Sequence, residues 1–439
     1  MLSQTHQFLR YSALAAPLSL VGLPLYVYLP SLFAASTGLS LAVIGTVLLA
    51  ARVFEAAADP LLGRGVAYLH AKYDAKPQWL HIALWLTTLI MAAAVVAVLV
   101  AQTWLGVLAS SAASKAALLT ACVALAYLGY SALTIAHHTL GAAHIATGTP
   151  AARLYAVREG CALGGVFLGS VLPLVLTAAG LSWGTYGLIT AVTLLLGVWL
   201  LRPQWGALSN QPTQASAPND GKFNTFADPF LRRSLLTFFI SSVSGSLPAT
   251  LLGFYVADVL GLGAQSPAFL AVYFVAAAAG FAAWPRLAAR YGTARIWAAA
   301  MAANGLIFVG AAFLSSTTPF VALWFGAVCV ATGALLGAEL MLPQTLIAKH
   351  LAARGAAQHA GVVFGWWTAA QKTALAIAAG AGLWALAALG YTPGSSANTG
   401  GLVLLYCGIP CVLKLLSAAI AWGIEADPAQ HTTLLTPKT

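Results

Sequence analysis

Apolar stretches of about 20 residues recur along this chain, and each is long enough to cross the hydrocarbon core of a bilayer as a helix. Of its 439 residues, 60% are hydrophobic and 7% are charged, whereas about 25% are charged in a typical soluble protein. The sequence therefore predicts an all-α membrane protein with twelve transmembrane helices. The predicted spans are 11–33, 41–63, 79–101, 116–143, 154–178, 183–202, 231–258, 266–284, 294–315, 319–348, 361–390 and 400–424.

Lysine and arginine residues are unevenly distributed between the two sides of these spans. When the N-terminus is placed in the cytoplasm, most of the 20 basic residues fall in or near cytoplasmic segments. This bias predicts that both termini are cytoplasmic, and we expect a multi-pass protein of the bacterial inner membrane. The placement of the basic residues therefore orients the chain in the lipid bilayer, and the net charge of +10 requires no nucleic-acid partner.

A polar segment at 209–221, rich in Pro, Ser and Asn, divides the predicted spans six and six. Such a composition is typical of a flexible linker. Two six-helix bundles with a solute site between them at mid-depth are the plan of the major facilitator fold, which we predict here. The predicted parts are an N-terminal bundle at 1–203, a cytoplasmic linker at 204–230, a C-terminal bundle at 231–425 and a cytoplasmic tail at 426–439.

Three charged residues, Arg52, Glu55 and Asp59, lie inside the second predicted span. A charge at mid-bilayer costs roughly 2.5–3.5 kcal/mol on insertion scales, so three of them in one span indicate a function. Their i, i+3, i+7 spacing places all three on one helix face. Two carboxylates and a guanidinium on one stripe predict a cation site with its own counter-charge. A purely structural ion pair inside a helix bundle is the alternative.

Four stretches carry a resemblance to a known family. They are residues 38–63 with an acidic helix ending in Asp-Pro-x-x-Gly, residues 76–79, Arg158, and residues 364–372 continuing to a Gly-Tyr-Thr-Pro run at 390–393. Together they resemble the glycoside–pentoside–hexuronide:cation symporter family, the melibiose permease-like branch of the major facilitator superfamily. The resemblance extends across nearly the whole chain.

The resemblance implies a predicted cation site formed by Glu55, Asp59 and Ser131, which would bind Na⁺, Li⁺ or H⁺ as the coupling ion. Hard oxygen ligands suit an alkali cation, and a pair of nearby carboxylates also suits a proton. It further implies that Lys372 in the eleventh span lies near this site as a counter-charge when the site is empty. Arg52, by its spacing from Glu55 and Asp59, is the counter-charge on the site's own helix. A lysine that snorkels to the interface is the alternative for Lys372.

The sugar-binding part departs from the family pattern. Ser19 and Thr134 stand where the family's sugar transporters have aspartates on helices one and four. Of the charged residues that contact sugar in the family, Arg158 alone is retained here. The resemblance thus implies substrate contacts by Ser19, Thr134 and Arg158. The intramembrane His137 and His138 are candidates for a substrate contact or a proton relay. The two histidines are adjacent and therefore about 100° apart, so at most one faces the cavity squarely. Hydrogen-bonded packing is the alternative for either ring.

We expect cation-coupled symport, with Na⁺ or H⁺, of a small organic solute such as a glycoside, by alternating access and by a monomer. The missing aspartates keep open a lysolipid or other amphiphile as the substrate, or a non-transporting receptor or assembly factor. No catalytic residue, metal site or cofactor is expected, because no span pairs a nucleophile with a base or clusters metal ligands. Glu339 in the tenth span and Lys414 in the twelfth are weaker candidates for a functional role inside the membrane.

Overall fold

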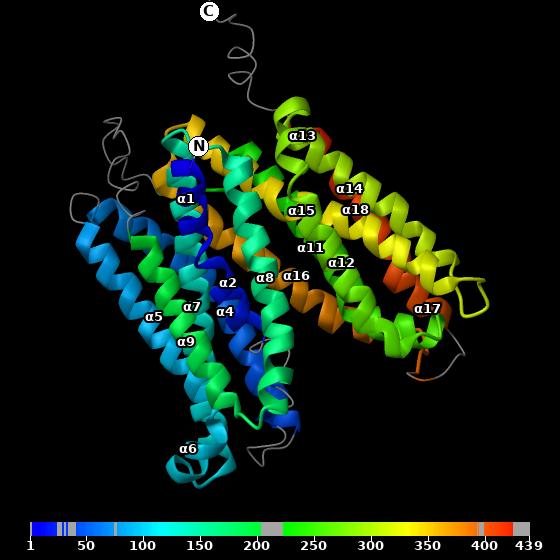
Figure 1. Cartoon of the computed structure of the whole chain (residues 1–439), viewed down its shortest axis with the longest axis horizontal. Coiled ribbons are helices and arrows are strands. Elements are labelled where there is room, and N and C mark those ends of the chain that lie inside the picture. Colours follow the sequence, from blue (N-terminus) through cyan, green and yellow to red (C-terminus); the bar gives the residue numbers. More distant parts are fainter. Residues whose placement is uncertain are drawn as a thin grey trace, which may run out of the picture. The chain divides into compact units, whose positions relative to one another are not determined.

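The computed structural model describes residues 2–23, 29, 32–33, 41–73, 77–202, 223–392, 394 and 399–424, and within these ranges the regular structure is entirely helical (Figure 1). Nine helices in the described part are long and apolar enough to cross a membrane. The prediction of an all-α, multi-pass membrane protein is therefore confirmed. The nine are Gln78–Leu99, Ala112–Ala146, Ala151–Ala178, Trp183–Leu201, Pro229–Val259, Gly263–Gly280, Thr293–Phe313, Val321–Ala353 and Thr399–Trp422.

The three other predicted spans fall on helices of different character. Part of the span at 11–33 lies outside the described residues, and its remainder forms two short helices. The span at 41–63 forms one 33-residue helix whose charged side chains lower its hydropathy. The span at 361–390 forms a 29-residue helix that is rich in alanine and glycine and contains a glutamine and a lysine. The membrane side of the chain termini stays a prediction.

The chain divides into two compact units, the first of which comprises Met1–Phe223 and Leu351–Ala369. Within it, α4 packs against α7, α2 against α8, and α5 against both α7 and α9 (Figure 1). Its helices are α1 (Leu2–Ser12), α2 (Ala15–Leu23), α4 (Leu41–Tyr73), α5 (Pro77–Leu99), α6 (Ala101–Leu108), α7 (Ala112–Ala146), α8 (Ala151–Ala178), α9 (Trp183–Leu201), η6 (Ala357–His359) and the first part of α16 (Ala360–Ala388).

Helices α4 and α16 cross with their backbones in contact inside the first unit. A Cβ atom on Gly365 would lie 2.7 Å from the carbonyl oxygen of Asp59, and one on Gly361 would lie 2.8 Å from that of Gly63. Glycines spaced four residues apart are a common device by which membrane helices approach closely, since no side chain separates the backbones. The crossing therefore holds the segment of α4 that carries Asp59 against α16.

The second unit comprises Asn224–His350 and Ala370–Thr439. In this unit α18 packs against both α14 and α11. Its elements are α11 (Pro229–Phe254), η3 (Tyr255–Val259), η4 (Gly263–Gln265), α12 (Ser266–Gly280), α13 (Trp284–Tyr291), α14 (Thr293–Val309), η5 (Gly310–Phe313), α15 (Val321–Ala353), the rest of α16, α17 (Thr399–Val403), η7 (Leu404–Gly408) and α18 (Ile409–Trp422).

An aromatic cluster forms part of the core of the second unit. The rings of Tyr255 and Tyr406 stack with their centroids 4.0 Å apart, and Phe325 lies beside them. The hydroxyl of Tyr255 donates a hydrogen bond to the carbonyl oxygen of Ala311, 2.5 Å away. Pairing this hydroxyl removes the cost of burying a polar group among apolar ones.

Helix α11 begins with a side-chain cap that ties it to α15. The Asp228 carboxylate accepts hydrogen bonds from the backbone N–H groups of Phe230 and Leu231 and also contacts His350 Nε2 at 2.8 Å. The ring of Phe230 stacks on that of His350, with centroids 3.9 Å apart. Burial alone would raise the pKa of Asp228, but the hydrogen bond and charge of His350 and the two N–H groups lower it.

The bounds of the two units can be compared with the predicted domain bounds. Their division at residues 223 and 224 lies within the range predicted as a linker, and Leu351–Ala369 group with the first unit. Residues 203–222 and 425–439, which hold most of the predicted linker and the predicted tail, lie outside the described residues. The predicted bundles and linker therefore stay predictions in their bounds.

Candidate functional site

The residues of the predicted cation site lie on α4 and α7 in the interior of the first unit. Glu55 is 1% exposed and Asp59 is 0% exposed, and both lie on one face of α4, one turn apart. The hydroxyl of Ser131 on α7 donates a hydrogen bond of 3.0 Å to Glu55 Oε1. The fold therefore brings two carboxylates and a hydroxyl from two packed helices to one buried region. Binding of a cation there stays a prediction.

Two basic residues were predicted to balance these carboxylates. Arg52 is half-buried on α4, and Tyr127 of α7 lies close enough to interact with both Arg52 and Glu55. Lys372 lies on the part of α16 that belongs to the second unit, whereas Glu55 is in the first. Its pairing with the predicted cation site stays a prediction.

Arg158 on α8 is the centre of a second buried polar group in the first unit. It forms an ion pair with Glu159, and its Nη2 donates a hydrogen bond of 3.1 Å to His138 Nε2 on α7. Because a guanidinium can only donate, His138 Nε2 accepts this hydrogen bond, and a ring nitrogen can do so only in the neutral imidazole. The ring of His138 stacks on Phe364 of α16 with centroids 4.8 Å apart. The group can therefore offer donors and an acceptor to a polar solute.

His137 faces a different side of α7 from His138 and joins α7 to α1. Its Nε2 donates a hydrogen bond of 2.8 Å to the carbonyl oxygen of Tyr11, and the Tyr11 hydroxyl donates one of 3.1 Å to the carbonyl oxygen of His137. The ring centroids of Tyr11 and His137 also lie 4.5 Å apart. This reciprocal pair corresponds to the packing alternative for His137. Its predicted contact with a solute stays a prediction.

Ser19 and Thr134, the predicted substrate contacts at the positions of the family's aspartates, lie on neighbouring helices of the first unit. Ser19 is half-buried on α2, and Thr134 is half-buried on α7 one turn before His138. These two helices are in contact with each other. The structure thus leaves the substrate role of both residues as a prediction.

Glu159 was missed by reasoning from the sequence. Adjacent residues on a helix point about 100° apart and do not ordinarily face each other, so spacing gives no signal for an Arg158–Glu159 pair. Both side chains are nevertheless buried and meet, since the long arginine side chain can turn back along the helix. A carboxylate next to an arginine inside an apolar span is the signal that could have found it.

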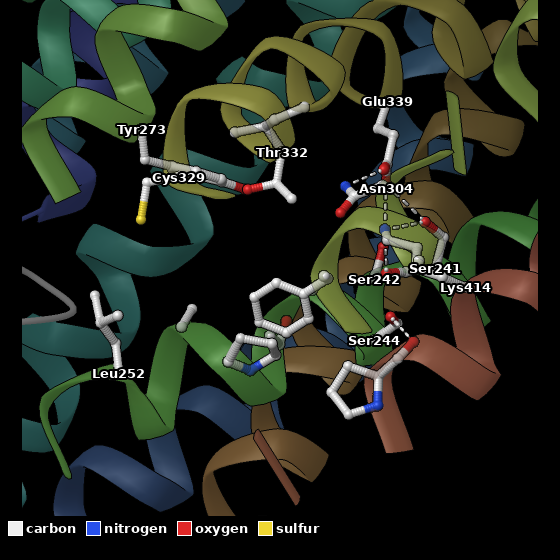
Figure 2. A pocket seen from close by; sticks show the side chains of 18 of the residues that line it. Ser241, Ser242, Ser244, Leu252, Tyr273, Asn304, Cys329, Thr332, Glu339 and Lys414 are labelled. Carbon is white, nitrogen blue, oxygen red and sulfur yellow. Dashed lines mark hydrogen bonds and ion pairs between the residues drawn. The ribbon is translucent and has the colours of Figure 1, made fainter. Parts of the chain in front are cut away.

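A third polar group lies in the second unit, beside a cavity of about 340 Å³. Lys414 of α18 forms a buried ion pair with Glu339 of α15. Glu339 also accepts hydrogen bonds from Asn304 of α14 at 2.8 Å and from Ser241 of α11 at 3.1 Å. Figure 2 shows these four side chains gathered on one side of the cavity, with Leu252 on the other. The sequence offered Glu339 and Lys414 only as separate, weaker candidates.

Comparison with solved structures shows the fold. A bacterial homologue of the iron transporter ferroportin, in an outward-facing state, is 16% identical with a TM-score of 0.69, covering 96% of this chain and 98% of that one. The fucose:proton symporter FucP of E. coli is 14% identical with a TM-score of 0.63, covering 97% and 99%. The proton:xylose symporter XylE is 14% identical with a TM-score of 0.64, covering 95% and 94%. No curated protein matches the sequence.

A family model described as MFS/sugar transport protein matches residues 10–426, which is nearly the whole chain. This match confirms the prediction of a transporter rather than an enzyme, and the helical architecture agrees with it. Membership of the narrower glycoside–pentoside–hexuronide:cation branch stays a prediction. The chain belongs to the MFS/sugar transport protein family and is a secondary transporter of the major facilitator superfamily.

Proposed function

We propose that this transporter is a cation symporter, in which Na⁺ or H⁺ binds at Glu55, Asp59 and Ser131 and drives uptake of a small organic solute such as a glycoside. Alternating access of the two units would couple the ion to the solute. We also propose that it works as a monomer in the bacterial inner membrane with both termini in the cytoplasm. The observation that carries the proposal is the buried Ser131–Glu55 hydrogen bond beside Asp59.

The chemistry of this site supports a small hard cation as its occupant. Side chains one turn apart on a helix have Cβ atoms about 6 Å apart. Two carboxylates at that separation repel by about 3 kcal/mol when the effective dielectric constant is about 20. A bound Na⁺ or a proton would remove that repulsion, and the Ser131 hydroxyl oxygen can serve as a further ligand. The empty site is therefore electrostatically unfavourable, which favours the binding of a cation there.

The group around Arg158 supports a polar solute as the partner of the ion. Its guanidinium and the remaining ring nitrogen of His138 can donate to hydroxyl groups, the Glu159 carboxylate can accept from them, and a guanidinium can also bind a carboxylate. Ser19 and Thr134 would add hydroxyls on the neighbouring helices. His137 would position this group rather than contact the solute, because its Nε2 is bonded to Tyr11.

The cation site can be tested without knowing the solute. Purified protein in detergent is heated in choline chloride, in NaCl and in LiCl at constant ionic strength, and at several pH values. A ligand that binds the folded state at 100 times its Kd adds about 2.7 kcal/mol of stability. We expect stabilisation of the wild type by Na⁺, or by lowered pH if the ion is H⁺, and none for the double variant Glu55→Gln and Asp59→Asn.

A matched control separates this site from other carboxylates. Asp258 lies on η3, which follows α11, and accepts hydrogen bonds from the Tyr391 hydroxyl and the backbone N–H of Gly394. Asp258→Asn should lower stability while the response to the cation persists. If the double variant responds to the cation as the wild type does, the proposed coupling site is wrong.

A further inference from the structure

The cavity of the second unit has a polar end whose charges are already satisfied. The Lys414 ammonium donates to Glu339 Oε2, to Ser241 Oγ at 2.9 Å and to the Ser241 carbonyl oxygen at 3.3 Å. Glu339 Oε1 in turn accepts from Asn304. Among the described residues that line the cavity, Glu339 and Lys414 are the two that carry charge, and they belong to one ion pair. The lining therefore has no net charge.

This neutrality restricts the kind of molecule that can enter. An ionic solute would bring an unbalanced charge into a buried region or would compete for one member of the Glu339–Lys414 pair. Removing one partner from a buried pair leaves an uncompensated charge, which is strongly unfavourable. A neutral solute meets neither penalty. The cavity thus favours neutral ligands over anions and cations.

Polar atoms that remain available lie around the same space. The Oδ1 atom of Asn304 and the hydroxyl of Tyr273 make no hydrogen bond with any part of the chain that the structure describes, although both residues line the cavity. The Thr332 hydroxyl donates to its own helix, which leaves its oxygen able to accept. Figure 2 shows these three side chains bordering the open space. They suit a ligand hydroxyl, which both donates and accepts.

The remainder of the lining is mostly apolar and rich in aromatic rings. Phe269, Phe308 and Tyr406 line it together with Cys329 and Leu252. Aromatic side chains provide large apolar contact areas and stack on planar or ring-shaped groups. A volume of about 340 Å³ lies at the small end of the range of about 300–1,000 Å³ seen for sites of small molecules. The body of the ligand should therefore be an apolar ring system of modest size.

We propose that this cavity binds a neutral solute that has an apolar ring at one end and hydroxyl groups at the other, such as an aryl glycoside. The ring lies against Phe269, Phe308 and Tyr406, and the hydroxyls bind Asn304, Thr332 and Tyr273. The site lies in the second unit and does not depend on cation coupling in the first, while the choice of a glycoside as its ligand rests on the proposed function.

Equilibrium binding to the purified full-length protein in detergent tests the proposal. The probe is 4-nitrophenyl β-D-glucopyranoside. The glucuronide with the same aryl group adds a negative charge, and methyl β-D-glucopyranoside removes the ring. We expect the neutral aryl glucoside to bind at least about tenfold more tightly than either analogue. Since no ion gradient exists in detergent, a failure of the proposed cation coupling would not affect this measurement.

Two leucines on α11 give a matched pair of variants. Leu252 lines the cavity, whereas Leu236 is exposed on the same helix. Leu252→Trp should fill the cavity and weaken binding of the aryl glucoside at least about tenfold, while Leu236→Trp should bind it as the wild type does. Equal binding by both variants would overturn the proposal, as would equal binding of the glucuronide or no binding of the aryl glucoside by the wild type.

A measurement on the wild type keeps the test valid if Leu252→Trp does not fold. Cys329 lines the cavity, whereas Cys122 lies half-buried on α7 in the first unit. We expect the aryl glucoside to slow alkylation of Cys329 by N-ethylmaleimide several-fold and to leave that of Cys122 unchanged, as read by peptide mass spectrometry. An unchanged rate at Cys329 with the aryl glucoside at saturation would refute the site.

Discussion

Replacing Lys414 by methionine is the most informative perturbation of the second unit. The change keeps the apolar length of the side chain but removes the cation that pairs with Glu339. Glu339 would keep its bonds to Asn304 at 2.8 Å and Ser241 at 3.1 Å, yet its buried charge would have lost its counter-ion. Breaking a buried pair in this way costs about 3–5 kcal/mol. We therefore expect Lys414→Met to lower the free energy of unfolding by about that amount.

A double-mutant cycle shows whether the loss comes from the pair itself. Removing both charges, as Glu339→Leu with Lys414→Met, leaves no uncompensated charge and should restore most of the stability. Free energies of unfolding would be measured by denaturant titration of the protein in mixed micelles. Arg290→Met serves as the control, because Arg290 is exposed on α13 and its loss should cost no more than about 0.5 kcal/mol. Strict additivity of the two single changes would refute the argument.

Three further predictions test other parts of the structure. Gly365→Ala should cost about 1–3 kcal/mol because its Cβ would lie 2.7 Å from a backbone oxygen of α4, whereas Gly380→Ala, with no atom within 4 Å, should cost nothing by thermal unfolding. The pKa of Asp228 is lower in the folded than in the unfolded protein, so its ionised form stabilises the fold. This stabilisation is fully present above the unfolded pKa of about 4. It is lost as the pH falls through the folded pKa. A pH titration of stability should lose this acid-side slope in Asp228→Asn, and an unchanged slope would contradict it. Lys372→Ala should weaken transport and stability, with partial rescue by a neutral change at Glu55; additive effects would rule out that pairing.

Much of the helical architecture could be predicted from hydropathy alone. The spans predicted at 79–101, 154–178 and 183–202 correspond within a few residues to α5, α8 and α9. The physical reason is that a backbone inside a bilayer must satisfy its own hydrogen bonds, so an apolar stretch of this length has few alternatives to a helix. Charged residues inside an apolar span were also informative. Glu55 and Asp59 are both buried on one face of α4, as their spacing predicts.

Hydropathy and charge are enough to predict the class of the protein, most of its helices and the intramembrane charges that need partners. Which partners those charges have depends on how the helices pack. Glu339 and Lys414 are 75 residues apart and meet because α15 and α18 line one cavity. His138 faces Arg158 while its neighbour His137 faces Tyr11. Hydropathy and periodicity describe one helix at a time, whereas the pairing of polar groups depends on how helices pack, and packing is decided by contacts between residues distant in the chain.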